Sequence, residues 1–124
     1  MIRFVLRGSI PSGKNSVTVT RSGMRFPNAR FKLWREDAFR QLDAQIPNVK
    51  VPAEWNPHIA ICYTPSDKRR RDVPGMIDAL FHLLEKYQTV DDDARLRNVT
   101  WESRTPVKNG GGVSVLIEDY ATNA

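Results

Sequence analysis

The chain has 124 residues, of which 40% are hydrophobic and 27% are charged. This length predicts one domain, residues 1–124, with enough apolar side chains for a core. No apolar run approaches the roughly 20 residues that cross a bilayer, and the single cysteine, Cys62, excludes an internal disulfide. We therefore expect a cytoplasmic protein that does not enter the membrane. A net charge of +5 favours a nucleic-acid partner.

The first part of the chain predicts a strand and a hairpin. Residues 2–6 (IRFVL) set Arg3 between apolar side chains, which is typical of a strand. Residues 8–16 are rich in Gly, Pro and Ser and predict a loop. Residues 17–27 combine β-branched residues with turn chemistry, so we expect a hairpin with Arg21 and Arg25 near its tip.

A helix and a buried strand should follow the hairpin. Apolar residues recur at helical spacing between residues 31 and 42, after a plausible cap at Asn28. This helix should end before Pro47. Residues 58–63 form a nearly continuous apolar run, which predicts a central strand.

A second helix is predicted after Asp72, a residue type that caps helices. Apolar side chains cover one broad face of this segment, whereas Asp78, His82 and Glu85 fall on another. Weak alternation at residues 96–101 and the run VSVLI at 113–117 predict two further strands. The element order indicates an α+β domain: two layers, with two main helices packed on one face of a mixed sheet.

The charges concentrate around this second helix. Four cations precede it (Lys68, Arg69, Arg70 and Arg71) and three carboxylates follow it (Asp91, Asp92 and Asp93). Clustered cations can neutralise phosphates, and carboxylates are ligands for hard divalent cations. Taken alone, the same residues also suit solvated loops and a helix cap. Lys14 could likewise contact phosphate or decorate a turn.

The order of these features resembles the RusA-like Holliday junction resolvases, small endonucleases common in phages. The opening strand and GSIPSGKNS resemble the family's strand and Gly-x-Pro-x-x-Lys-x-x loop, with the proline one place late. FPNARFKLWREDAF resembles the entry into the first helix. RRRDVPGMIDALFHLLEKYQTVDDDARL resembles the signature, which is a basic run, an Asp, a helix and an Asp-Asp pair before a strand.

The resemblance implies a homodimer with Mg²⁺ or Mn²⁺ held by three aspartates and assisted by a lysine. The first aspartate matches Asp72 and the third matches Asp93, with Asp92 beside it. The remaining positions depart from the pattern, because Pro74 replaces the second aspartate and Asp78 replaces the lysine. Positions 74 and 78 lie one turn apart on one helix face, so Asp78 could act as a substitute ligand.

The sequence therefore predicts a metal-dependent endonuclease that resolves branched DNA in recombination and repair. Asp72, Asp78 and Asp93 would be catalytic and, with Asp92, would hold the metal. Seven cations would hold the DNA: Lys14, Arg21, Arg25, Lys68, Arg69, Arg70 and Arg71. The carboxylates of Asp72, Asp78 and Asp93 should converge on one cavity. Two rival hypotheses are a relative that binds branched DNA without cutting it and a non-enzymatic adaptor with the same fold.

Overall fold

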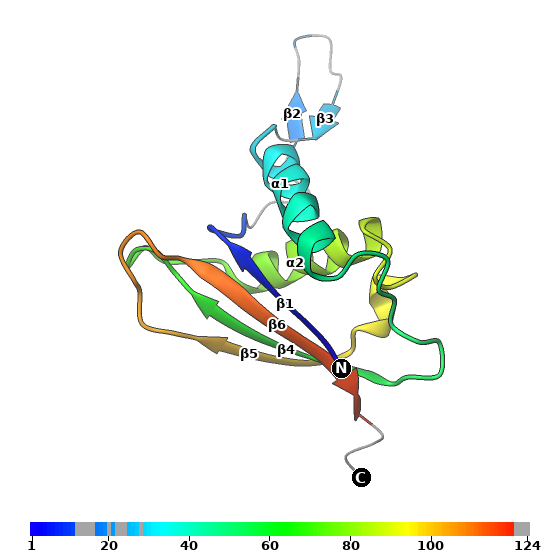
Figure 1. Cartoon of the computed structure of the whole chain (residues 1–124). Coiled ribbons are helices and arrows are strands. Elements are labelled where there is room, and N and C mark those ends of the chain that lie inside the picture. The colour runs from blue at the N-terminus through cyan, green and yellow to red at the C-terminus, as the bar shows by residue number, and fades with distance from the viewer. Residues whose placement is uncertain (12–16, 20, 22–24, 28, 121–124) are drawn as a thin grey trace.

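The computed structural model describes residues 1–11, 17–19, 21, 25–27 and 29–120 (Figure 1). Lys14 and Asn28, which were expected to contact DNA and to cap the first helix, lie outside these ranges. The elements in chain order are β1 (Ile2–Arg7), β2 (Val17–Val19), β3 (Arg25–Pro27), α1 (Ala29–Gln45), β4 (Pro57–Thr64), α2 (Val73–Lys86), the short 3₁₀ turn η1 (Asp93–Arg95), β5 (Asn98–Ser103) and β6 (Gly112–Asp119).

The main sheet has four strands in the order β1-β6-β4-β5. β6 pairs antiparallel with both β1 and β4, whereas β4 and β5 run parallel. The expected mixed sheet is thus confirmed, as is the hairpin, in which β2 and β3 pair antiparallel. The parallel pair requires a crossover, and α2 provides it. As a result, the chain enters α2 from the carboxyl end of β4 and leaves it toward the amino end of β5.

One face of the sheet carries the core. Ile59, Ile61 and Tyr63 of β4 are buried and alternate with half-buried neighbours, as expected for a strand with one covered face. Both helices pack on this face, which confirms the predicted two-layer arrangement (Figure 1). The apolar run predicts that Cys62 is a buried hydrophobic residue, but Cys62 points to the other face and is only half-buried, because the strand alternates and its neighbours Ile61 and Tyr63 take the core face.

The helix α2 forms where the sequence predicts it. The Asp72 side chain accepts a hydrogen bond of 3.2 Å from the Gly75 N–H, and Pro74 occupies the first turn, where a missing N–H costs nothing. The apolar face of α2 is buried through Met76, Ala79, Leu80, Leu83 and Leu84. With 14 residues, α2 is about 21 Å long.

The two helices also contact each other through a polar pair. The Tyr87 hydroxyl at the end of α2 donates a hydrogen bond to the Asp43 carboxylate of α1. Burial and this carboxylate together raise the pKa of Tyr87 to about 12. The hydroxyl therefore stays protonated at neutral pH and holds the carboxyl-terminal turn of α2 against α1.

The chain after α2 differs in one detail from the sequence-based expectation. The strand predicted at residues 96–101 runs from Asn98 to Ser103, because η1 takes up Asp93–Arg95 and turns the chain toward the sheet. Among the helices in the described ranges, none is both long and apolar enough to cross a membrane.

Candidate metal site at the carboxyl-terminal end of α2

The three consecutive aspartates after α2 have three different environments. The Asp91 carboxylate accepts a hydrogen bond of 3.0 Å from the Arg95 guanidinium, and Arg95 lowers the pKa of Asp91. Asp92 caps η1 by accepting a bond of 2.9 Å from the Ala94 N–H. The Asp93 N–H donates to the Glu85 carboxylate at 3.1 Å. Asp91 is thus tied to a cation, while Asp92 and Asp93 turn toward α2.

Glu85, Asp92 and Asp93 form a compact group. One carboxylate oxygen from each lies within 4.8 Å of the others. Glu85 and Asp93 are half-buried, and Asp92 is exposed. Two oxygens bound to one Mg²⁺ lie at most about 4.2 Å apart, twice the usual metal–oxygen distance. Small side-chain rotations would therefore let all three carboxylates bind one hard divalent cation.

Glu85, Asp92 and Asp93, here called the acidic trio, lie where the last turns of α2 meet η1. Glu85 belongs to the last turns of α2, and η1 returns the chain directly beside it, so the backbone of Asp93 contacts the Glu85 side chain. Bringing three negative charges together is unfavourable unless a cation neutralises them. The nearby Arg97 is exposed, and its Nε donates to the Ala94 carbonyl oxygen at 3.1 Å, which adds a positive charge beside the group.

The expected convergence of Asp72, Asp78 and Asp93 is wrong. Asp72 caps the amino-terminal end of α2, whereas Asp93 contacts Glu85 near the carboxyl-terminal end. Thirteen residues separate Asp72 from Glu85, which corresponds to about 20 Å of helix. The physical reason is the parallel pairing of β4 with β5. Because the two strands run in the same direction, α2 must carry the chain back along their length before β5 begins.

Asp78 lies between these two ends. It precedes Glu85 by seven residues, which places the two side chains on one helix face about 10 Å apart along the axis. Within the described ranges, the group of potential metal ligands contains Glu85, Asp92 and Asp93 and omits Asp78. Glu85 was missed as a ligand at the sequence level. The signal for it was the polar face through Asp78, His82 and Glu85, whose last member ends next to the acidic run.

The basic run lies at the opposite end of α2 from the trio. Lys68, Arg69 and Arg70 are exposed. Arg71 differs, because its side chain is only 23% exposed and donates to the Asp67 carboxylate at 2.8 Å. Asp67 also accepts a bond of 2.9 Å from the Arg69 N–H, the main cause that lowers the pKa of Asp67.

The pairing with Asp67 gives Arg71 a structural role in the loop. The Tyr63 hydroxyl and the Asp67 carboxylate raise the pKa of Arg71, so the guanidinium stays charged between them. The three cations before it are exposed, and Arg69 Nε also lies 3.9 Å from the Asp67 carboxylate. In the hairpin, Arg21 is exposed in the turn, and Arg25 begins β3, where it pairs with Val19 in the last pair before the loop, so its expected place near the tip is confirmed.

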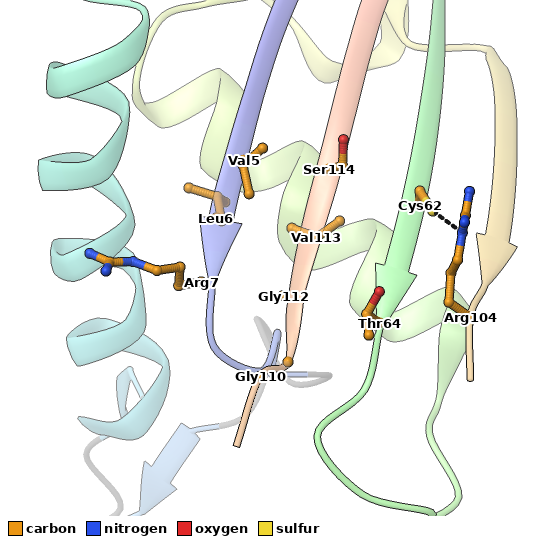
Figure 2. A pocket seen from close by; sticks show the side chains of 11 residues that line it. Val5, Leu6, Arg7, Cys62, Thr64, Arg104, Gly110, Gly112, Val113 and Ser114 are labelled. Carbon is orange, nitrogen blue, oxygen red and sulfur yellow. Dashed lines mark hydrogen bonds between the residues drawn. The ribbon is translucent and has the colours of Figure 1, made fainter. Parts of the chain in front are cut away.

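A separate cavity of about 470 Å³ opens on the uncovered face of the sheet (Figure 2). Its lining includes the Cys62 thiol, which accepts a contact of 2.9 Å from Arg104 Nε. Gly112 also lines it and lets β6 approach β1 closely, because an added Cβ there would lie 2.7 Å from the Leu6 carbonyl oxygen. None of the described residues that line it carries a carboxylate, so these residues offer a hard cation no charged ligand.

The site can thus supply three carboxylates for one divalent metal ion. The exposed basic side chains of Lys68, Arg69 and Arg70 lie beyond the other end of α2. Comparison of the chain with models of known protein families and with curated proteins finds no match.

Proposed function

We propose that the protein is a divalent-metal-dependent endonuclease acting on branched DNA such as Holliday junctions. The observation that carries this proposal is the group of Glu85, Asp92 and Asp93, with carboxylate oxygens within 4.8 Å of one another. Three carboxylates on a short helix–turn unit suit Mg²⁺ or Mn²⁺, which prefer oxygen ligands. The likeness of the stretch from Arg69 to Leu96 to the RusA-like signature supports the same reaction class.

The chain's own residues would have distinct tasks in this reaction. Glu85, Asp92 and Asp93 hold the cation, which supplies an activated water and stabilises charge on the scissile phosphate. The Asp93 N–H, bonded to Glu85, fixes the orientation of one ligand. Arg97, whose Nε donates to the carbonyl oxygen of Ala94, the residue after Asp93, would attract a phosphate that approaches the cation.

The exposed basic residues Lys68, Arg69 and Arg70 would bind the DNA backbone at a point distant from the scissile bond. They lie at the other end of α2, which is about 21 Å long. At 3.4 Å per base pair, that length corresponds to roughly six base pairs of duplex. A substrate that touches both ends must therefore extend along or around α2, as the arms of a junction do.

The second candidate function is structure-selective DNA binding without cleavage. Two features favour it. Pro74 and Asp78 depart from the family's metal-binding pattern, and Asp72 lies far from Asp93. In this case Lys68, Arg69 and Arg70 would still bind DNA, and the acidic trio would be a solvated surface.

A binding and cleavage assay on a synthetic four-way junction separates the two candidates. In Ca²⁺ or in EDTA, we expect the junction to bind more tightly than a linear duplex of the same sequence. On exchange into Mg²⁺ or Mn²⁺, we expect paired incisions near the branch point. Tight junction binding with no incision in either metal would contradict the nuclease proposal and favour the second candidate.

A further inference from the structure

The loop between α1 and β4, residues 46–56, lies beside the acidic turn that follows α2 (Figure 1). The Val51 N–H donates to the Thr89 carbonyl oxygen at 2.8 Å. In return, the Arg95 guanidinium donates to the Val51 carbonyl oxygen at 3.4 Å and to the Pro52 carbonyl oxygen at 2.7 Å. Thr89 precedes the three consecutive aspartates, and Arg95 follows them. The same short segment of the loop therefore holds both ends of the acidic turn.

Arg95 makes the contacts that close this turn at its far end. Its side chain is 22% exposed and also donates to the Asp91 carboxylate at 3.0 Å. Because the Asp91 side chain is 79% exposed, water screens this ion pair, and exposed ion pairs contribute little. The two carbonyl oxygens accept charge-assisted hydrogen bonds from a largely buried guanidinium, and such bonds are stronger than those between neutral groups. The contact with residues 51 and 52 is thus the main attachment of η1 to the loop.

The start and the middle of the turn are attached to α2 instead. The Thr89 N–H donates to the Leu84 carbonyl oxygen at 3.0 Å, and the Asp93 N–H donates to the Glu85 carboxylate at 3.1 Å. Arg95 provides a third point of attachment. Of these three points, it is the one that depends on a side chain outside the acidic trio, so it can be changed without removing a proposed metal ligand.

The carboxylates of the acidic trio have no ion pair to hold them together. Among the described residues, no salt bridge involves Glu85, Asp92 or Asp93. Arg95 follows Asp93 by two residues, but its guanidinium is bonded to residues 51, 52 and 91. Three like charges repel one another. Before a cation binds, the spacing of the three carboxylates therefore depends on how firmly the backbone of the turn is held.

We propose that Arg95 is a positioning residue for the metal site. By holding the end of η1 to residues 51 and 52, it keeps Asp92 and Asp93 beside Glu85 before a cation binds. The inference rests on the metal site of the proposed function, and it adds a residue that contacts neither the cation nor the substrate. Mg²⁺ requires nearly ideal octahedral geometry, whereas Ca²⁺ accepts flexible sets of ligands. A preformed trio would therefore favour Mg²⁺ and Mn²⁺ over Ca²⁺.

The affinity of Arg95→Ala for Mn²⁺ distinguishes positioning from a simple effect of charge. Removing a positive charge near a cation should strengthen metal binding if charge alone matters. If Arg95 positions the trio, Mn²⁺ should bind about 10- to 100-fold more weakly, the usual effect of losing a group that orients metal ligands. Electron paramagnetic resonance of free Mn²⁺, titrated with the protein in the absence of DNA, measures the dissociation constant. Parental or stronger Mn²⁺ binding by folded Arg95→Ala would overturn the proposal.

The preference between cations gives a second measurement on the same variant. Because Ca²⁺ tolerates a loosened set of ligands, Arg95→Ala should lose more affinity for Mn²⁺ than for Ca²⁺, measured by Ca²⁺ competition against Mn²⁺. A loss of affinity that is equal for the two cations would contradict positioning.

Two further variants separate the contacts of Arg95. Asp91→Asn breaks the exposed ion pair and leaves both carbonyl bonds, so its Mn²⁺ affinity should stay within about fivefold of the parent. Arg95→Lys keeps the charge, but a single ammonium lacks the fixed fork of a guanidinium. It should bind Mn²⁺ more weakly than the parent and more tightly than Arg95→Ala. Equal losses in Asp91→Asn and Arg95→Ala would contradict the role of the carbonyl bonds.

Circular dichroism in EDTA shows whether each variant is folded. If Arg95→Ala is unfolded, Arg95→Lys decides the question: Mn²⁺ affinity below that of Asp91→Asn supports positioning, and parental affinity overturns it. The same titrations separate this inference from the proposed function. A parent chain that does not bind Mn²⁺ contradicts the metal site itself, whereas Mn²⁺ binding that is insensitive to Arg95 contradicts only the positioning role.

Discussion

Replacing Glu85 by glutamine should lower the rate of junction cleavage on the order of a hundredfold or more. The change removes one of three charges that hold the cation, and even groups that only orient a metal ligand contribute roughly 10- to 100-fold. Glutamine keeps a side-chain oxygen that can accept the Asp93 N–H, so the local fold should persist. Junction binding in EDTA should remain or become tighter, because a negative charge near phosphate is lost.

The matched control for this variant is Asp91→Asn. It also removes one negative charge near the carboxyl-terminal end of α2, but the Asp91 carboxylate is 79% exposed and pairs with Arg95. We expect cleavage close to the parental rate, measured by single-turnover kinetics in Mg²⁺. Equal losses in Glu85→Gln and Asp91→Asn would show that net charge matters and that the trio does not bind the metal.

The triple replacement of Lys68, Arg69 and Arg70 by alanine should produce the second large effect. Each phosphate contact contributes about 0.9 to the slope of log affinity against log salt. If all three cations contact phosphate, the slope should flatten by about 2.7, and affinity at low salt should fall accordingly. Fluorescence anisotropy of a labelled junction at several salt concentrations measures both quantities.

Two single variants sharpen this test. Arg40→Ala removes a cation whose side chain is 74% exposed on α1 and should leave the salt slope unchanged. Arg71→Ala should mainly lower thermal stability, because it breaks a half-buried pair with Asp67. If the slope of log affinity against log salt is unchanged in the triple variant, Lys68, Arg69 and Arg70 do not contact the DNA.

The sequence predicts the elements well where local patterns decide them. The alternation in β4 and the cap at Asp72 each depend on near neighbours, and both appear in the structure. The placement of Asp93 relative to Asp72 could not be predicted in this way. It depends on whether β5 pairs parallel or antiparallel with β4, which is a property of the whole sheet.

Glu85 illustrates the same limit for the site. Its helical face was visible from the spacing of Asp78, His82 and Glu85, but spacing alone does not say which end of α2 meets the acidic run. The contact between Glu85 and the Asp93 N–H arises because η1 folds back on the last turns of α2. The RusA-like pattern predicts ligands in the first turns of α2, around Pro74 and Asp78, whereas the trio lies at the other end of the helix.

Anomalous diffraction from crystals soaked in Mn²⁺ tests the central claim most directly, because it locates the cation. We expect one peak bounded by the carboxylates of Glu85, Asp92 and Asp93, and its loss in Glu85→Gln. A peak at Asp72 or Asp78 with none at the trio would contradict the account, as would crystals that bind no Mn²⁺ at the trio.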